Sequence, residues 1–449
     1  MQLKQTASGI AVRLLNWLAG WSYQWGWRNV AAGLFKRVLR LEPTNPIIHV
    51  RLCSLALEAR DFNTGYAHAV SAYLLAPGHP WASFALACSY TALGRIREAF
   101  AILDGVVKQV PGFVNARTER GYVSLGLGHI EEGYQDLQAL AETPKYQATA
   151  RLFNIPSCPL WDGSNLNGKT ILLWSNEGYG DALQFIRYVP LVAAHGGTVI
   201  VKAPTVLARL FSHIPGIAKV VTQTEGLSGI ACHVPLTLLP TVLKTTAETI
   251  PNVVPYLSPP EQVNPVPCRV PGALKVGLVW AADKTHERDS IIGLRSLPPS
   301  CLYPLLSVAG VEWYSLQVGP SVQELAQHGV RGMIHDLSPR LTDFDETAGV
   351  IRQLDLVISV DTAVAHLAGA LGMSTWLLLP YVADPRWMIE RIDTPWYPTL
   401  LLFRQTQDRV WMGPVLTARM ALEEIVKRRG MEGRALEEVT IEQPARVAA

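Results

Sequence analysis

Residues 359–372 read SVDTAVAHLAGALG and place groups that can bind an anion at the start of a predicted helix. The preceding apolar run predicts a buried strand that ends just before Asp361, and the small residues after Thr362 predict a helix. Small residues such as Gly369 would let a ligand approach this helix closely. The first N–H groups of a helix have no partner within it and carry a partial positive charge, so an anion would dock near Thr362 and Ala363. His366 lies one turn further along the same face. Two other interpretations stay open, because Asp-Thr pairs often only cap a helix and a histidine on an apolar helix often belongs to the core.

A second group of polar residues follows another predicted strand, KTILLWS, in the segment SNEGYGDALQF (residues 175–185). Asp181 stands near the carboxyl end of that strand, after a turn that contains Gly178 and Gly180. A carboxylate there can take a proton from an attacking hydroxyl group or stabilise positive charge on a reacting carbon. The two glycines allow a substrate to approach the backbone closely. The alternative is an aspartate that only caps the next helix.

A basic loop, WAADKTHERDSIIGLRS (residues 280–296), follows the predicted strand KVGLVW. The fork of an arginine can bind two phosphate oxygens at once, so Arg295, with the hydroxyl group of Ser296 beside it, is a candidate phosphate ligand. Lys284 is a weaker candidate in the same loop. Charged loop residues that bind no ligand are the alternative interpretation.

No metal site is expected. The acidic pair Asp343 and Asp345 precedes a predicted helix instead of ending a strand. The six cysteines are widely spaced, with no CxxC pair and no histidine cluster at ligand spacing, which indicates free thiols in a reducing compartment. The net charge of +2 and the lack of a long Lys/Arg run give no reason to expect nucleic acid as a partner.

Length and composition indicate a folded protein of two or three domains, since the chain has 449 residues, 49% of them hydrophobic and 17% charged. No signal peptide is predicted, and no apolar run approaches the ~20 residues of a membrane-spanning helix. Tryptophans cluster near basic residues at positions 17, 21, 25 and 27. Attachment to a membrane surface is one interpretation of this cluster, and ordinary helix packing is the favoured one.

A repeat organises the N-terminal third, where Pro43, Pro77 and Pro111 lie 34 residues apart and each closes a helical segment. The pattern resembles tetratricopeptide repeats, in which small residues lie where paired helices cross and proline ends the second helix. We expect about three full repeats over residues 25–143, with a weaker capping helix on either side. A helical bundle of coincidental spacing is the alternative.

From residue 169 onward, strand and helix patterns alternate, which predicts parallel sheets with crossover helices. The first such helix is expected over residues 181–196, ended by Gly196. A segment with six prolines (residues 254–272) interrupts the pattern and reads as a linker, after which the alternation restarts. The expected fold is α plus α/β, with the following parts: a helical repeat domain over 1–150, an α/β domain over 151–265, a second α/β domain over 266–430 and a flexible tail over 431–449.

The stretch DTAVAHLAGALG resembles the signature of glycosyltransferase family 9, the heptosyltransferase-like enzymes, and the two α/β domains resemble their GT-B fold. The resemblance implies that Asp181 is the general base. It implies that the donor is bound by Asp361, Thr362, Ala363, His366, Arg295, Ser296, Lys284, Gln317 and Asp336. On the acceptor side it implies Gly178, Gly180, Gln184 and Arg187, although Arg187 could merely brace the sheet. Asn176 and Glu177 depart from the Glu-Gln that is usual before this turn in the family.

The expected activity is the transfer of a sugar, with inversion and without a metal or cofactor, from a nucleotide-sugar donor to a macromolecular acceptor. The whole chain resembles a bacterial subgroup that fuses tetratricopeptide repeats to such a domain, and the repeats would recruit a protein or a surface glycan. The expected location is the cytoplasm, with peripheral contact at the inner membrane as an option, and the oligomeric state stays open. The rival functions are a non-catalytic scaffold with a degenerate transferase domain and, less favoured, a nucleotide-sugar epimerase.

Overall fold

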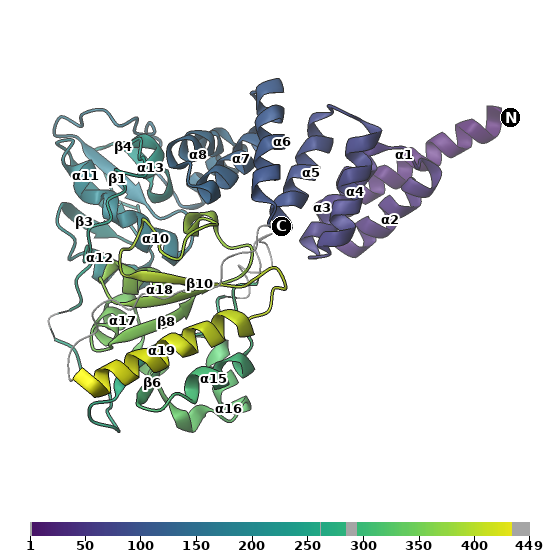
Figure 1. Cartoon of the computed structure of the whole chain (residues 1–449). Coiled ribbons are helices and arrows are strands. Elements are labelled where there is room, and N and C mark those ends of the chain that lie inside the picture. The colour runs from purple at the N-terminus through teal and green to yellow at the C-terminus, as the bar shows by residue number, and fades with distance from the viewer. Residues whose placement is uncertain (1, 261, 284–293, 433–449) are drawn as a thin grey trace. The chain divides into compact units, whose positions relative to one another are not determined.

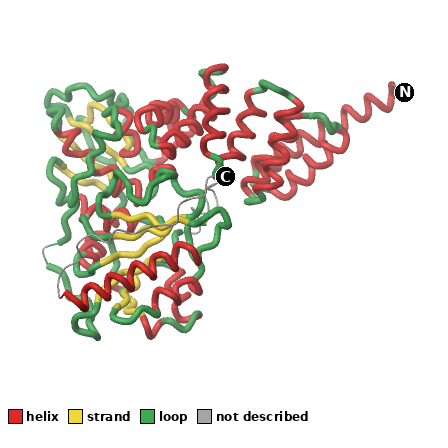
Figure 2. The backbone as a smooth tube through the Cα atoms, viewed as in Figure 1, coloured by secondary structure: helices red, strands yellow, loops and turns green. Residues whose placement is uncertain are grey.

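The computed structural model of the chain describes residues 2–260, 262–283 and 294–432. It divides into two compact units (Figure 1). The first holds the chain as far as Leu140, together with the short segment Asp384–Arg386, and the second begins at Ala141. Helices alone build the described part of the first unit, whereas the strands lie in the second (Figure 2).

The first unit is a succession of helices that pack against their neighbours in the chain. They are α1 (Gln2–Gln24), α2 (Arg28–Leu41), α3 (Pro46–Glu58), α4 (Phe62–Leu75), α5 (Pro80–Ala92), α6 (Ile96–Gln109), α7 (Val114–Leu127) and α8 (Ile130–Leu137). The pairs that begin at α3, α5 and α7 start 34 residues apart, and each repeat proline follows two residues after the end of α2, α4 or α6. Proline cannot continue a helix, which explains this placement. The tetratricopeptide-like organisation is thereby confirmed.

Glycines lie where these helices cross most closely, as the repeat pattern implies. A Cβ atom on Gly121 of α7 would lie 2.9 Å from the carbonyl oxygen of Gly133 of α8, and one on Gly133 would lie 3.0 Å from the carbonyl oxygen of Gly121. A larger residue at either position would therefore push the two helices apart.

The second unit begins with α9 (Pro144–Leu152) and an α/β lobe, here called the N-lobe, whose four parallel strands have the order β3-β2-β1-β4. Its elements are β1 (Thr170–Trp174), α10 (Tyr179–Phe185), α11 (Val189–Ala193), β2 (Thr198–Lys202), α12 (Thr205–Phe211), β3 (Ile217–Val221), β4 (Ile230–Pro235) and α13 (Leu239–Val242). One continuous helix was expected over residues 181–196. That expectation is wrong, because Pro190 opens a separate helix, α11, after a short 3₁₀ turn.

A second α/β lobe, the C-lobe, follows the proline-rich segment and has six parallel strands in the order β10-β9-β8-β5-β6-β7. Its described elements are β5 (Leu274–Val279), α15 (Tyr303–Leu306), β6 (Val311–Ser315), α16 (Glu324–Gln327), β7 (Ile334–Asp336), α17 (Phe344–Ile351), β8 (Leu356–Val360), α18 (Ala363–Ala370), β9 (Thr375–Leu379), β10 (Leu400–Arg404) and α19 (Met412–Glu432). The expected fold class, helical repeats followed by two Rossmann-like lobes, is confirmed.

The strand orders fix where each lobe can bind a ligand. In the N-lobe the chain reverses its direction of travel across the sheet between β1 and β4, and in the C-lobe it does so between β5 and β8. Ligands of open parallel sheets bind outside the carboxyl ends of the strands at such switch points. The segments that follow β1, β5 and β8 are those that hold the Asp181 turn, the basic loop and the Asp361-Thr362 turn.

Candidate functional site

The Asp361-Thr362 turn lies directly after the buried strand β8, as predicted. Thr362 occupies the N-cap position of α18 but makes no side-chain capping bond; its Oγ1 lies 3.1 Å from the Oγ of Ser359 instead. Thr362 and Ala363 are half-buried, whereas Asp361 is only 4% exposed. The helix start is therefore partly open to solvent, and its first N–H groups are not capped by the Thr362 side chain.

His366 is buried one turn into α18, and its ring faces protein groups on both sides. Its Nδ1 lies 2.8 Å from the hydroxyl oxygen of Tyr397, and its Nε2 lies 3.8 Å from Oδ1 of Asp361. The ring also stacks on Trp387, with 5.3 Å between the ring centroids. These contacts orient the Nε2 side of the imidazole toward Asp361, which directly precedes the N-cap residue of α18.

The small residues of α18 have a packing role as well. A Cβ atom on Gly369 would lie 2.5 Å from Cδ1 of Tyr397, so glycine is needed there to admit the tyrosine ring. The aromatic residues Trp387, Trp396 and Tyr397 are each 1% exposed or less. Trp387 and Tyr397 contact the His366 ring, and Trp396 contacts Phe185 of α10.

The N-lobe motif meets the C-lobe motif at Gly180. A Cβ atom on Gly180 of α10 would lie 2.8 Å from Cδ2 of His366, so only glycine lets the two helices approach this closely. The ring of Tyr179 contacts that of Phe344 in α17, with 5.5 Å between centroids. Two motifs that are far apart in the sequence are thus adjacent in space.

Asp181 follows Gly180 directly and is half-buried as the third residue of α10. Its Oδ2 accepts a hydrogen bond of 3.2 Å from the backbone N–H of Gly178, the N-cap residue, which is the N3 half of a capping box, since glycine has no side chain to supply the other half. Asp181 therefore does cap the start of α10. The bond also fixes the carboxylate beside the contact between the two lobes, where the positive end of α10 stabilises its charge.

Arg187 is buried and joins the two lobes. Its guanidinium donates to the carbonyl oxygens of Gln184 (2.7 Å), Pro251 (3.3 Å) and Trp396 (2.5 Å) and to the hydroxyl of Tyr256 (2.9 Å). Gln184 itself is fully buried. Of the two interpretations of Arg187, the geometry favours the brace over an acceptor contact, because its Nε, Nη1 and Nη2 atoms already donate within the protein.

The basic loop returns beside β5, the strand adjacent to β8. The hydroxyl of Ser296 accepts a 2.9 Å bond from the N–H of Ala282, and the half-buried Arg295 precedes it. Because β5 and β8 are neighbours, their carboxyl ends lie about 5 Å apart, which brings this segment to the same edge as Asp361. Lys284 lies outside the described residues.

Gln317 follows β6 and Asp336 is the last residue of β7, and both side chains form hydrogen bonds with the backbone. The Gln317 amide oxygen accepts from the N–H groups of Trp280 (3.2 Å) and Ala281 (3.0 Å), and its amide nitrogen donates to the carbonyl oxygens of Ala281 (3.1 Å) and Val318 (3.0 Å). This leaves the amide no spare hydrogen-bonding position, so it positions the loop after β5. Asp336 accepts from the N–H of Ser338 at 3.0 Å, on the edge strand of the sheet.

The acidic pair Asp343 and Asp345, at the N-cap and in the first turn of α17, contacts the N-lobe. Asp343 caps α17, and Nη2 of Arg209 lies 3.1 Å from Oδ1 of Asp343 and 2.9 Å from Oε1 of Glu346. The Nε of Arg209 lies 2.7 Å from the buried carboxylate of Asp345. Burial raises the pKa of Asp345. These carboxylates thus serve an ion-pair network between the lobes.

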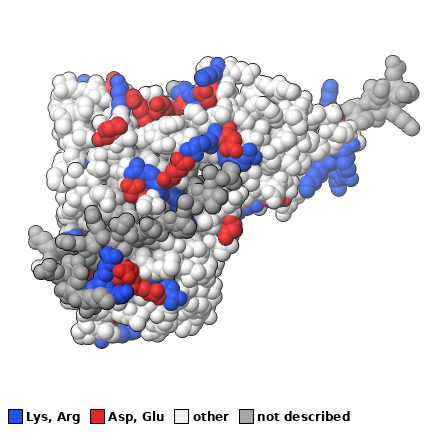
Figure 3. Space-filling model, in the orientation of Figure 1, with Lys and Arg blue, Asp and Glu red and all other residues white. Residues whose placement is uncertain are grey.

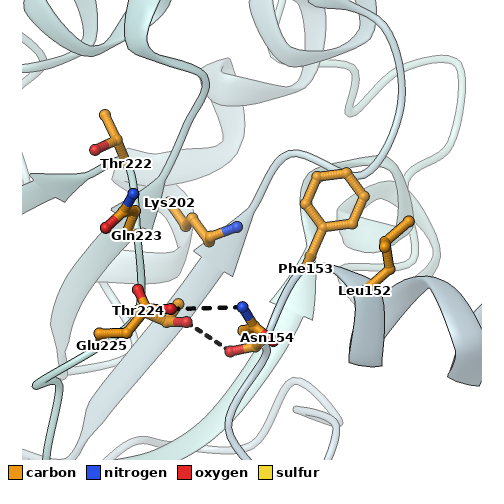
Figure 4. Close-up of a pocket in the computed structure, with 8 residues that line it drawn as sticks. All are labelled: Leu152, Phe153, Asn154, Lys202, Thr222, Gln223, Thr224 and Glu225. Atoms are coloured by element: carbon orange, nitrogen blue, oxygen red, sulfur yellow. Dashed lines mark hydrogen bonds between the residues drawn. The ribbon is translucent and has the colours of Figure 1, made fainter.

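A concavity of about 160 Å³ opens at the carboxyl ends of β2 and β3 in the N-lobe (Figure 4). The Nζ of Lys202 lies 4.9 Å from the centroid of the Phe153 ring, and burial lowers the pKa of this amine. Asn154 accepts from Thr224 at 2.6 Å and donates to Glu225 at 3.5 Å. The other residues that line it are Leu152, Thr222 and Gln223.

The concavity and the partners Tyr256 and Arg209 were not predicted from the sequence. Strand β2 carries the concavity next to β1, and the N–H of Ser175, just before the Asp181 turn, donates to the carbonyl oxygen of Lys202 at 3.0 Å. No spacing signal marks such residues, since Asn154 and Glu225 are 71 positions apart. For Tyr256, a tyrosine inside a proline-rich linker was the available hint.

Comparisons with known proteins bear on the same region. Residues 319–375 match the family model described as glycosyltransferase family 9 (heptosyltransferase), and this segment includes Asp336, the Asp361-Thr362 turn and α18. The chain is 28% identical over 367 residues to the protein FlbA of Caulobacter vibrioides, which covers 73% of this chain and 59% of FlbA. The present chain thus spans about three-fifths of the length of this curated relative.

Two solved structures are also similar. An O-GlcNAc transferase mutant of Thermobaculum terrenum matches with a TM-score of 0.36 and 14% identity, over 94% of this chain and 93% of that chain. The ADP-heptose lps heptosyltransferase II of E. coli matches with a TM-score of 0.37 and 14% identity, over 57% of this chain and all of that chain (100%). The fold assignment rests on the strand order of the chain itself. The chain thus combines tetratricopeptide-like helices with two Rossmann-like lobes, and residues 319–375 of the second lobe match the glycosyltransferase family 9 model.

Proposed function

We propose that this protein is a glycosyltransferase that moves a sugar from a nucleotide-sugar donor to a hydroxyl group of a macromolecular acceptor, with inversion and without a metal ion. The observation that carries the proposal is the contact of Gly180 with His366. It sets Asp181 of the N-lobe beside the entrance of α18, and the family 9 match covers that entrance. A scaffold has no need for both motifs to meet.

The donor diphosphate lies at the start of α18 in this proposal. The N–H groups near Thr362 and Ala363, and the guanidinium of Arg295, neutralise its charge. His366 and Asp361 hold the entrance of the helix in shape, and Gln317 fixes the loop after β5. The segments that follow β5, β6 and β8 of the C-lobe therefore form the donor side of the site in this proposal.

The chemical step needs a base on the N-lobe side. The acceptor oxygen attacks the anomeric carbon, its proton passes to the carboxylate of Asp181, and the bond between the sugar and the diphosphate breaks. The nucleoside diphosphate leaves with the electron pair of that bond and is stabilised at the α18 N-terminus. Asp181 regains its carboxylate form when the proton passes to water.

The concavity beside Lys202 is the proposed binding place for the acceptor. It lies at the same sheet edge as the Asp181 turn and combines an aromatic ring with amide, hydroxyl and charged groups. Such a lining can bind a polar group of the acceptor that lies next to the reacting hydroxyl. Transfer assays with glycan and with peptide acceptors test which class of molecule carries that group.

The second candidate function is a non-catalytic scaffold. One observation favours it: the Asp181 carboxylate already caps α10 through the N–H of Gly178. In this alternative the α18 entrance binds a nucleotide or no ligand, and the repeats supply the function.

The deciding experiment measures donor hydrolysis by the full chain, with and without candidate acceptors. A thermal-shift screen of nucleotides and nucleotide sugars first identifies the donor, because a ligand that binds only the folded state raises Tm. Slow hydrolysis that becomes transfer when acceptor is added supports the enzyme. Nucleotide binding without hydrolysis or transfer supports the scaffold.

A further inference from the structure

Helix α1 has apolar side chains on two opposite faces. Val12 and Ala19 face inward and pack with Phe35 of α2 in the core. Four other apolar residues, separated by four, three and four positions, form one stripe along the outer side of the helix. The exposed fractions are 68% for Ile10, 55% for Leu14, 65% for Trp17 and 39% for Trp21.

The stripe continues into the turn between α1 and α2. The ring centroid of Trp21 lies 5.9 Å from that of Trp25 and 5.2 Å from that of Trp27, and these two rings are 65% and 52% exposed. The tryptophans are therefore not packed inside the helical unit, contrary to the favoured interpretation of the sequence. We call this surface the outer apolar face; its residues are Ile10, Leu14, Trp17, Trp21, Trp25 and Trp27.

The same helix pair is strongly basic. Residues 1–41 contain six Lys or Arg residues and no Asp or Glu. Arg28 forms an ion pair with Glu58 at 2.6 Å, whereas Lys36, Arg37 and Arg40 are exposed on one side of α2, and no ion pair is recorded for them in the described structure. Basic side chains gather over this part of the first unit (Figure 3).

We infer that α1 and α2 dock on the surface of an anionic lipid bilayer. Tryptophan, leucine and isoleucine side chains enter the boundary between headgroups and acyl chains, and basic side chains contact the anionic headgroups. No helix of the described chain is long and apolar enough to cross a membrane. A second copy of the chain is a poorer occupant, because a symmetric contact would set two basic helix pairs against each other.

The test is co-sedimentation of the full chain with two kinds of vesicle, one of equal parts phosphatidylglycerol and phosphatidylcholine and one of phosphatidylcholine alone. We expect binding to the anionic vesicles only, and loss of binding between ~0.1 M and ~1 M salt as the screening length falls from about 10 to about 3 Å. The variant Lys36→Gln/Arg37→Gln/Arg40→Gln should bind about 100-fold more weakly, and Leu14→Gln/Trp17→Gln about tenfold more weakly or worse.

Two matched controls separate this surface from general effects of charge or polarity. Leu74→Gln changes a leucine that is 70% exposed on α4, and Lys169→Gln/Lys219→Gln/Lys244→Gln removes three exposed lysines from the second unit. Both should bind vesicles like the unaltered chain, and circular dichroism checks that all variants fold. Equal binding by the basic-residue variant, or no binding to anionic vesicles, overturns the inference. So does light scattering that shows self-association abolished by Leu14→Gln/Trp17→Gln while vesicle binding persists.

Discussion

Asp181 has a structural contact in addition to its proposed role as a base. One of its oxygens caps α10 through the N–H of Gly178, and the residue lies beside the contact between the lobes. An asparagine can keep this capping bond, because its amide oxygen accepts from the same N–H, but it cannot serve as a base.

We therefore predict that Asp181→Asn leaves donor binding nearly unchanged and lowers turnover on the true acceptor by ~100-fold or more. Calorimetry with the donor and initial rates with the acceptor measure the two effects separately. Asp343→Asn, at the N-cap of α17, is the matched control and should keep normal turnover. Wild-type turnover by the Asp181→Asn variant would leave the residue with its capping role alone.

Arg295 carries the second prediction at this scale. Its segment lies at the sheet edge next to Asp361, and a guanidinium there would bind the donor diphosphate. Arg295→Ala should weaken nucleoside diphosphate binding by ~1.5–3 kcal/mol, the range for a hydrogen bond to a charged group. Titration calorimetry checks this, with Arg331→Ala, an exposed arginine of the same lobe, as control. Equal affinity for both variants would move the phosphate site elsewhere.

At the scale of elements, the contact of α10 with α18 joins the two lobes. The interatomic distance of 2.8 Å from a Cβ on Gly180 to Cδ2 of His366 means that an alanine requires the helices or the ring to shift. Such overpacking typically costs ~1–3 kcal/mol. We predict that Gly180→Ala lowers the free energy of local opening of α10 and α18 by this amount and weakens donor binding.

Hydrogen exchange of peptides from α10 and α18 measures that opening. Gly413→Ala is the control, because a Cβ on this helical glycine of α19 meets no atom within 4 Å. It should leave exchange in both helices unchanged. Unaltered exchange in Gly180→Ala would mean that the two helices adjust at no cost.

Elements that depend on local pattern could be predicted from the sequence. The end of β8 before Asp361, the helix after it and the 34-residue period are examples, because strand and helix periodicity and proline placement act within a few residues. The residues that contact the candidate site residues could not be predicted in this way. Arg187 donates to the carbonyl oxygen of Trp396, 209 positions away, and only the folded packing of the lobes brings such groups together.

Residue type also did not reveal which polar groups are already engaged. Gln317 was expected to bind the donor, yet its amide makes four hydrogen bonds to backbone. Gly369 was explained by close approach of a ligand, whereas the Tyr397 ring fills that space. The same types of side chain can brace the interior of a protein or bind a ligand at its surface. Residue type alone therefore left the structural and the ligand-binding interpretations open.

At the scale of the whole molecule, the candidate chemistry is confined to the second unit. Asp181, Arg295 and the α18 entrance all belong to it, and the first unit, up to Leu140, holds none of them. Stacked helix pairs of this kind form extended surfaces for peptides and helices. The first unit is thus expected to select the acceptor and to take little part in bond making.

We predict that a truncated chain that begins at Ala141 binds and slowly hydrolyses the donor like the full chain but loses transfer to the native acceptor at micromolar acceptor concentration. A tethered second binding surface raises the effective acceptor concentration to the millimolar range, and truncation removes it. Rates measured across acceptor concentrations should show activity returning only as the acceptor approaches that range. The first unit added as a separate chain at equal concentration is the control, and it should not restore transfer, because the tether is absent. If the truncated chain modifies its native acceptor as efficiently as the full chain, the repeats serve assembly or stability, and acceptor choice lies in the N-lobe.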